Sequence, residues 1–241
     1  MVLTVGIVKG GTGKTSTAAA LAQAAAHDGR RVLCIDLDPQ ANLTYILGAD
    51  GSKAGAYQLL TGEDPEIATQ ETEQGLSVIA ASPDLATLKT AAGSAKRLKA
   101  ALDPVRGGYD WIIVDTPPQM GELTYNAIVA SDRLLVPLEA DVNSMQGFYQ
   151  ILDVAAGLRK GNPLEVSGII VTRYDGRPKI NRHLLTEIQK GAEEAGAPFL
   201  GTIRAGVAIR EAQALQVSLY EYAPKSKPAL DYMAIYNRLK Q

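Results

Sequence analysis

Short apolar and β-branched runs recur along the chain and alternate with segments whose apolar residues have helical spacing. These runs are Leu3–Val8, Arg31–Asp36, Leu76–Ala81, Trp111–Asp115, Leu134–Leu138, Val166–Thr172 and Phe199–Ile203. Several are apolar throughout rather than alternating, as expected of strands buried between two layers of helices. The pattern therefore predicts an α/β fold: a doubly wound, mostly parallel sheet flanked by helices. The polar stretch from Gly48 to Gly75 predicts a surface excursion with a short helix at Tyr57–Leu60.

Composition and length indicate one globular domain spanning residues 1–241, with 46% hydrophobic and 21% charged residues. No apolar run approaches the roughly 18 residues of a transmembrane helix, and no basic leader precedes the first predicted strand. The single cysteine, Cys34, lies within an apolar run, which favours a buried structural side chain over a redox or metal centre. We expect a cytoplasmic protein with no membrane partner.

A glycine-rich segment follows the first predicted strand and leads into an Ala-rich stretch that favours a helix. It reads Lys9-Gly10-Gly11-Thr12-Gly13-Lys14-Thr15-Ser16. In such a loop the backbone N–H groups can turn toward a phosphate, and the helix adds the positive potential of its N-terminus. Lys14 can reach the outer phosphates, and the Thr15 hydroxyl can bind Mg²⁺. The segment predicts a P-loop fold that binds ATP or ADP with Mg²⁺; the alternative is a glycine-rich turn without a ligand.

The loop departs from the general P-loop pattern at its start. The pattern G-x-x-x-x-G-K-[ST] would place a glycine at position 8, where this chain has Val8, and Lys9 precedes the glycine pair. A lysine five residues before Lys14 resembles the signature lysine of the deviant Walker A family, which has ParA, MinD and nitrogenase iron-protein branches. The resemblance implies that Lys9 crosses to the phosphates of a second copy of the chain, so that ATP occupancy controls homodimerisation.

Carboxylates end two of the predicted strands, at the sheet edge where ligands bind in open α/β sheets. Asp36 and Asp38 belong to a segment that resembles the D-x-D-P-Q-x-N motif of ParA and Soj proteins, and Asp115 falls at the Walker B position. The resemblance implies that Asp38 orients or activates the attacking water, while Asp36 and Asp115 serve the Mg²⁺ ion. We expect weak, Mg²⁺-dependent ATP hydrolysis that a partner stimulates, with Lys9, Lys14 and Asp38 as catalytic residues.

The resemblance to ParA and Soj proteins extends over nearly the whole chain. Further matching segments are 135–147, 172–177 and 219–227. A nitrogenase-type cluster would require more cysteines than one. MinD-like membrane attachment would require a basic amphipathic tail, whereas Pro228–Gln241 favours a final helix that docks on the domain. A metabolic P-loop ligase or kinase stays open as an alternative, although such an enzyme would not require Lys9.

A region near residue 204 departs from the family pattern. Many relatives read I-P-R-N-V-R there, whereas this chain reads Ile203-Arg204-Ala205-Gly206-Val207-Ala208. The resemblance implies that this segment holds the base of the nucleotide. Because the proline and asparagine are missing, we expect Arg204 and Gly206 to contact adenine through backbone atoms only.

Basic residues follow the strand predicted at Val166–Thr172. The resemblance implies non-specific DNA binding by the ATP-bound dimer, and the candidates are Arg177, Lys179 and Arg182. Basic side chains without aromatic neighbours suit phosphate contact more than base reading; the alternative is a set of solvated loop charges. With a ParB-like adaptor, such a nucleoid-associated protein would segregate or position a plasmid, chromosome or other cargo. The alternative function is a MinD-like or other ATP-switched positioning scaffold that does not bind DNA.

Overall fold

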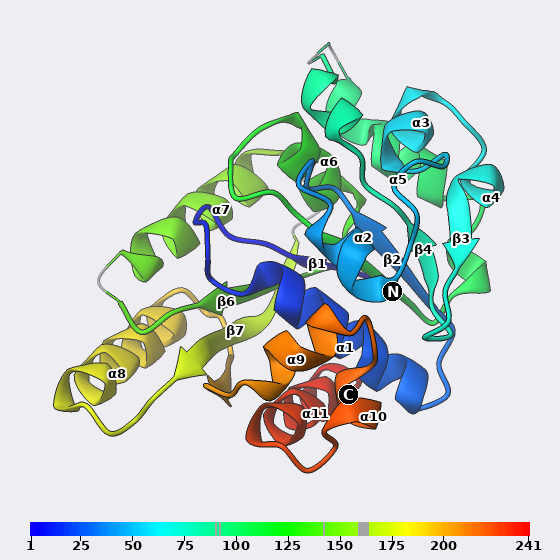
Figure 1. The fold of residues 1–241 in the computed structure, drawn as a ribbon. Coiled ribbons are helices and arrows are strands. Elements are labelled where there is room, and N and C mark those ends of the chain that lie inside the picture. Colours follow the sequence, from blue (N-terminus) through cyan, green and yellow to red (C-terminus); the bar gives the residue numbers. More distant parts are fainter. Residues whose placement is uncertain (90, 92, 142, 159–163) are drawn as a thin grey trace.

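The computed structural model describes residues 1–89, 91, 93–141, 143–158 and 164–241 as one eight-stranded sheet covered by helices on both faces (Figure 1). The strands are β1 (Val2–Val5), β2 (Val32–Asp36), β3 (Thr69–Glu71), β4 (Ser77–Ile79), β5 (Trp111–Asp115), β6 (Arg133–Leu138), β7 (Glu165–Tyr174) and β8 (Phe199–Arg204). The α-helices are α1 (Lys14–His27), α2 (Asn42–Leu47), α3 (Ala56–Thr61), α4 (Pro65–Ala68), α5 (Arg97–Leu102), α6 (Glu122–Ala130), α7 (Ser144–Leu158), α8 (Lys179–Glu194), α9 (Ala208–Ala214), α10 (Leu219–Tyr222) and α11 (Lys227–Leu239).

The strand order is β3-β4-β2-β5-β1-β6-β7-β8. Every neighbouring pair is parallel except β3 and β4. Strand β1 lies between β5 and β6. Strands β2 to β5 all lie on one side of β1, and strands β6 to β8 lie on the other. The ends of β1, β2 and β5 therefore open at one crevice on the carboxyl edge of the sheet, which is where doubly wound sheets bind ligands.

Alternating residues of the central strands point to opposite faces of the sheet, and each face packs against its own set of helices. On one face, Leu3, Cys34 and Ile113 pack with α1, α2 and the C-terminal helices α9–α11, which Figure 1 shows grouped together. On the other face, Leu33 and Ile112 pack with α3, α5 and α6, and a further cluster extends to α7 and α8. Because both faces of each central strand are buried, these strands read as continuous apolar runs, which confirms the predicted fold class.

The structure corrects the first predicted strand. We expected a strand over Leu3–Val8, but β1 ends at Val5. Ile7 is apolar because it packs against α7 in the core, and it does not continue the ladder. At Gly6, an added Cβ would approach the Ile151 side chain within 3.2 Å, so the chain leaves the sheet in tight contact with α7.

The excursion between Gly48 and Gly75 is more ordered than the sequence indicates. Its predicted short helix is confirmed as α3. The excursion also contains β3, which adds an antiparallel edge to the sheet and which the polar sequence Thr-Gln-Glu did not predict. At the other end of the chain, α11 is confirmed as a docked helix, since Tyr232, Tyr236 and Leu239 are buried against the body of the domain.

Candidate functional site

The glycine-rich loop joins β1 to α1 and borders a cavity of about 690 Å³ at the carboxyl edge of the sheet. Gly11 and Gly13 have φ values of +77° and +81°, a region that favours glycine. Helix α1 begins at Lys14, and no side chain of the described structure caps its first turn. The first N–H groups of α1 are thus open toward the cavity, which suits an anion such as a phosphate.

Lys14 is folded back on this loop. Its ammonium group donates a hydrogen bond to the Lys9 carbonyl at 2.7 Å, and only 6% of the residue is exposed. Burial lowers the pKa of Lys14, whereas the nearby carboxylates Asp115 and Asp38 raise it. A buried cation with two carboxylates nearby and a carbonyl as its direct partner is well placed to turn toward an incoming phosphate.

Two carboxylates meet at adjacent strand ends, because Asp36 and Asp115 are register partners in β2 and β5. Asp36 accepts hydrogen bonds from the Asp38 N–H (3.0 Å) and from the backbone and hydroxyl of Thr44 (both 2.8 Å). Burial nevertheless raises the pKa of Asp36 to about 6. The donors fix the orientation of Asp36 and occupy its oxygens.

Asp115 is different, because both of its carboxylate oxygens are buried and neither accepts a hydrogen bond from the described residues. Burial and the neighbouring charge of Asp36 raise the pKa of Asp115 well above its usual range, while Thr15 and Lys14 oppose the shift. A buried carboxylate without a donor is either protonated or paired with a cation. Oxygen ligands from Asp115 and Thr15 fit Mg²⁺, with Asp36 in an outer position.

The described residues contain no cluster of three or more His, Cys, Asp or Glu side chains that could hold a metal ion. A Mg²⁺ site that relies on one or two carboxylates and on phosphate oxygens of the nucleotide does not require such a cluster. Asp38 lines the phosphate cavity, and its Oδ1 accepts a hydrogen bond from the Gln40 N–H at 3.0 Å. Its position beside the cavity is compatible with the predicted role toward water, which stays a prediction.

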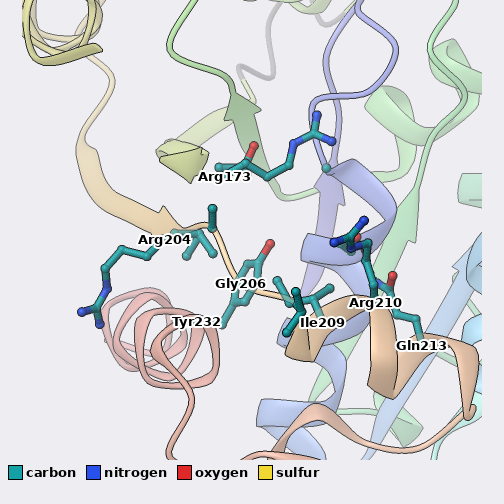
Figure 2. Close-up of a pocket in the computed structure, with 13 residues that line it drawn as sticks. Arg173, Arg204, Gly206, Ile209, Arg210, Gln213 and Tyr232 are labelled. Carbon is teal, nitrogen blue, oxygen red and sulfur yellow. Dashed lines mark hydrogen bonds between the residues drawn. The ribbon is translucent and has the colours of Figure 1, made fainter. Parts of the chain in front are cut away.

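A second cavity, of about 480 Å³, adjoins the phosphate cavity and shares Gly13, Ser16 and Arg173 with it (Figure 2). Its walls come from the end of β8, from α9 and from Tyr232 of α11. The largely apolar lining and the position next to the loop suit the ribose and base of a nucleotide.

Arg204 and Gly206 line this second cavity, as the sequence predicted. The side chain of Arg204 is directed away from it toward α11, where its Nη2 lies 2.7 Å from the Asp231 carboxylate (Figure 2). The structure is thus compatible with contact through backbone atoms alone, which stays a prediction. Sequence reasoning missed Gln213 of α9, which donates a hydrogen bond to the Ser16 hydroxyl at 3.0 Å.

Lys9 has partners within its own chain. Its ammonium group forms an ion pair with Asp141 and donates a hydrogen bond to the Ser144 hydroxyl at 3.3 Å. Both partners lie just after β6, more than 130 residues from Lys9, so the sequence alone did not indicate them. In a single copy of the chain, Lys9 is therefore held at the edge of its own phosphate loop.

Strand β7 supports the loop from the opposite side. The Thr172 hydroxyl lies 2.8 Å from the Thr12 carbonyl and 3.1 Å from the Leu138 carbonyl. Arg173 follows it and contacts the Gly11 carbonyl. These contacts tie the phosphate loop to the strand that leads into the predicted DNA-binding residues.

The predicted DNA-binding residues lie together in the loop after β7 and the first turn of α8. The Arg177 side chain is 91% exposed and forms a two-pronged ion pair with Asp175, which lowers the pKa of Asp175 to about 2. Arg182 donates to the carbonyls of Gly176 (2.7 Å) and Arg177 (2.8 Å), and Lys179 begins α8. The cluster is held together by these contacts, but its contact with DNA stays a prediction.

No helix among the described residues has the length and apolar character needed to cross a membrane.

The family model described as an AAA domain matches residues 1–165. Among characterised proteins, the chromosome-partitioning ATPase Soj of Thermus thermophilus is 37% identical over 228 residues, covering 93% of this chain and 89% of that protein. The sporulation initiation inhibitor protein Soj of Bacillus subtilis is 32% identical over 93% of this chain and 92% of its own length.

Solved structures agree with these relatives. A structure named as cobyrinic acid a,c-diamide synthase from Mycobacterium smegmatis, with bound ADP and magnesium, has 32% identity and a TM-score of 0.82, covering 98% of this chain and 92% of its own. A variant of McdA from Cyanothece in complex with ATP has 25% identity and a TM-score of 0.87, covering 99% and 96%.

Proposed function

The chain belongs to the ParA/Soj family of P-loop ATPases, within the ParA/MinD superfamily, and we propose that it is a partitioning ATPase whose bound nucleotide controls its dimerisation. The observation that carries the proposal is the position of Lys9 beside the phosphate loop, held by Asp141 of its own chain. A second subunit's phosphates are a stronger partner for a lysine than a half-exposed carboxylate is.

The chain binds ATP or ADP together with Mg²⁺, as its solved relatives do. Bound Mg²⁺ neutralises phosphate charge and stabilises the charge that develops during hydrolysis. Lys14 would leave the Lys9 carbonyl to hold the outer phosphates, Asp115 and Thr15 would hold the ion, and Asp36 would support them from behind. Asp38, at the rim of the same cavity, orients the attacking water.

Dimerisation follows from the same contacts. In the proposed cycle, ATP binding draws Lys9 from Asp141 to the phosphates of the partner subunit, and hydrolysis removes that contact. An exchange of this kind makes the dimer conditional on ATP, because only the partner's bound nucleotide supplies the phosphates that draw Lys9 from Asp141. A ParB-like adaptor would accelerate hydrolysis and so set the lifetime of the dimer.

DNA contact is proposed for the loop after β7. Thr172 touches the phosphate loop and Arg177 lies five residues further along the same segment, so the nucleotide site and the basic cluster share one short connection. A dimer presents two copies of the basic cluster, so DNA binding should require the ATP-bound dimer. Because the contacts are made to DNA phosphates, binding should weaken steeply with salt. Such a protein would associate with the nucleoid and move a plasmid, chromosome or other cargo.

Retention on non-specific duplex DNA tests this proposal against a positioning scaffold that does not bind DNA. The wild-type protein should be retained with Mg²⁺ and ATP and released by ADP or by high salt. Arg177→Ala should abolish retention and leave nucleotide binding intact, whereas Arg97→Ala, an arginine at the start of α5, should behave as wild type. Equal retention of Arg177→Ala would remove this residue from the DNA site, and no retention of wild type would favour the scaffold.

The name carried by the Mycobacterium smegmatis structure introduces an amide-forming synthase as a second candidate. A synthase would activate an acceptor carboxylate with ATP and would not depend on a lysine shared between subunits. Hydrolysis that proceeds without any acceptor and is lost in Lys9→Ala favours the partitioning ATPase. Turnover that requires an added carboxylate and tolerates Lys9→Ala favours the synthase.

A further inference from the structure

Arg173 occupies an unusual position between the two cavities of the nucleotide site. It lines both the phosphate cavity and the base cavity. Its guanidinium contacts the Gly11 carbonyl of the phosphate loop and forms an ion pair with Glu139. Figure 2 shows the side chain extending from β7 along the top of the pocket toward the loop that precedes α1.

The backbone of β7 is distorted at this residue. Arg173 has a φ of +51°, which residues other than glycine seldom adopt. The register with β8 shifts between Val171 and Tyr174, as in a β-bulge. A bulge changes the direction of a side chain, and bulges are frequent beside functional sites. Here the bulge turns Arg173 toward the phosphate loop.

The Arg173 side chain can leave its present partners, the Gly11 carbonyl and Glu139, and bind a phosphate instead. Its side chain is 58% exposed, and Glu139 beside it is 30% exposed, so neither group is locked in the core. The guanidinium has five N–H donors in a planar fork that matches phosphate oxygens. A carboxylate and a carbonyl now satisfy some of these donors.

We propose that Arg173 is a phosphate-binding residue of this site and contacts the phosphate nearest the ribose. The two cavities meet at Gly13, Ser16 and Arg173, and in a nucleotide the α-phosphate is the group that joins the ribose to the outer phosphates. Arg173 therefore serves ATP and ADP alike, whereas Lys14 serves the outer phosphates. The inference rests on the proposed nucleotide site and adds to it a cation that the P-loop motif does not contain.

Titration with fluorescently labelled ADP in Mg²⁺, with unlabelled AMP as competitor, tests this role. Arg173→Met should weaken ADP binding on the order of tenfold, the usual scale for one charge-assisted contact, and should weaken competition by AMP by a similar factor. Competition by adenosine should not change. Arg173→Lys should recover part of the loss, because it keeps the charge without the planar fork.

Arg31→Met is the matched control. The Arg31 side chain is 63% exposed and pairs with Asp110, and it precedes β2 at the edge of the sheet opposite the nucleotide site. The affinities of Arg31→Met for ADP and AMP should stay within about twofold of those of the wild-type protein.

Two results would overturn the role of Arg173. Unchanged ADP and AMP affinities in Arg173→Met would show that it contacts no phosphate. A weaker ADP affinity with unchanged AMP competition would show that Arg173 only supports the loop through the Gly11 carbonyl, because AMP lacks the outer phosphates that the loop holds. A wild-type protein that binds no nucleotide would instead contradict the proposed function itself, and this inference with it.

Discussion

Replacement of Asp115 by asparagine should stabilise the protein without ligand and remove its response to Mg²⁺ with ADP. Asp115 is a buried carboxylate whose oxygens accept no hydrogen bond from the described residues. The ionised form of Asp115 destabilises the folded state relative to the unfolded state. Bound Mg²⁺ offsets this destabilisation, so it remains when the ion is absent. An amide of the same shape carries no charge. Asp115→Asn should therefore remove both the destabilisation by the buried charge and the binding of Mg²⁺.

Asp36 gives the scale of this effect. It has three hydrogen-bond donors, and burial still raises its pKa to about 6. Measured from an ordinary value near 3.9, a shift of this size corresponds to about 3 kcal/mol. Asp115 lacks those three donors, and only Thr15 and Lys14 oppose its raised pKa; an asparagine amide also needs partners when it is buried. We therefore expect Asp115→Asn to gain about 1–3 kcal/mol at pH 8, or on the order of 5 °C in Tm.

The sign of the pH dependence follows from the raised pKa of Asp115. When the pKa of a carboxyl is higher in the folded than in the unfolded state, its favourable contribution is complete at low pH and is lost as pH rises through the folded value. Wild type should therefore lose stability between pH 5 and pH 8, and the advantage of Asp115→Asn should be smaller at pH 5 than at pH 8.

Calorimetric unfolding in EDTA and in Mg²⁺ with ADP checks both effects. Asp110→Asn is the control, because Asp110 immediately precedes the same strand at its opposite end and pairs with Arg31. This control should lose a little stability and respond to Mg²⁺ with ADP as wild type does. The reasoning is refuted if Asp115→Asn is less stable than wild type in EDTA at pH 8, or if Mg²⁺ with ADP stabilises both equally.

Three further predictions concern the loop and the core. Asp141→Asn removes the own-chain partner of Lys9 and should increase the dimer fraction at limiting ATP in sedimentation velocity; an unchanged fraction would show that Asp141 does not compete for Lys9. Thr172→Val keeps the shape of the side chain but removes the hydroxyl shared by the Thr12 carbonyl of the loop and the Leu138 carbonyl at the end of β6, so urea unfolding should show a loss of about 1–2 kcal/mol, together with weaker ADP binding. Cys34 is fully buried, which raises the pKa of its thiol, so iodoacetamide should label it only after unfolding, as mass spectrometry would detect; rapid labelling of the folded protein would contradict this burial.

The fold could be predicted because both faces of the central strands are covered. Continuous apolar runs such as Ile112–Val114 are typical of strands with helices on each side, so the pattern of apolar residues indicates the layers. The edge strand β3 carried no such signal, since its three residues are polar and half-exposed or exposed. Ile7 misled the prediction because a residue buried under α7 has the same apolar character as a strand residue.

Residues of the site could be located from the sequence where they belong to a local motif or end a recognisable strand. The loop from Lys9 to Ser16 is one continuous motif, and Asp115 ends a recognisable strand. The contacts of Lys9 with Asp141 and of Arg173 with Gly11 join residues more than 130 positions apart. They depend on the order of the sheet, in which β6 lies beside β1 and β7 beside β6, and on a positive φ at Arg173 that its residue type does not predict.

The central claim is that ATP controls dimerisation through Lys9, and light scattering on a sizing column tests it most directly. Wild type should elute as a dimer with Mg²⁺ and ATP and as a monomer with ADP or without nucleotide. Lys9→Ala should bind ATP and stay monomeric. Dimerisation of wild type without ATP, or ATP-dependent dimerisation of Lys9→Ala equal to that of wild type, would contradict the account.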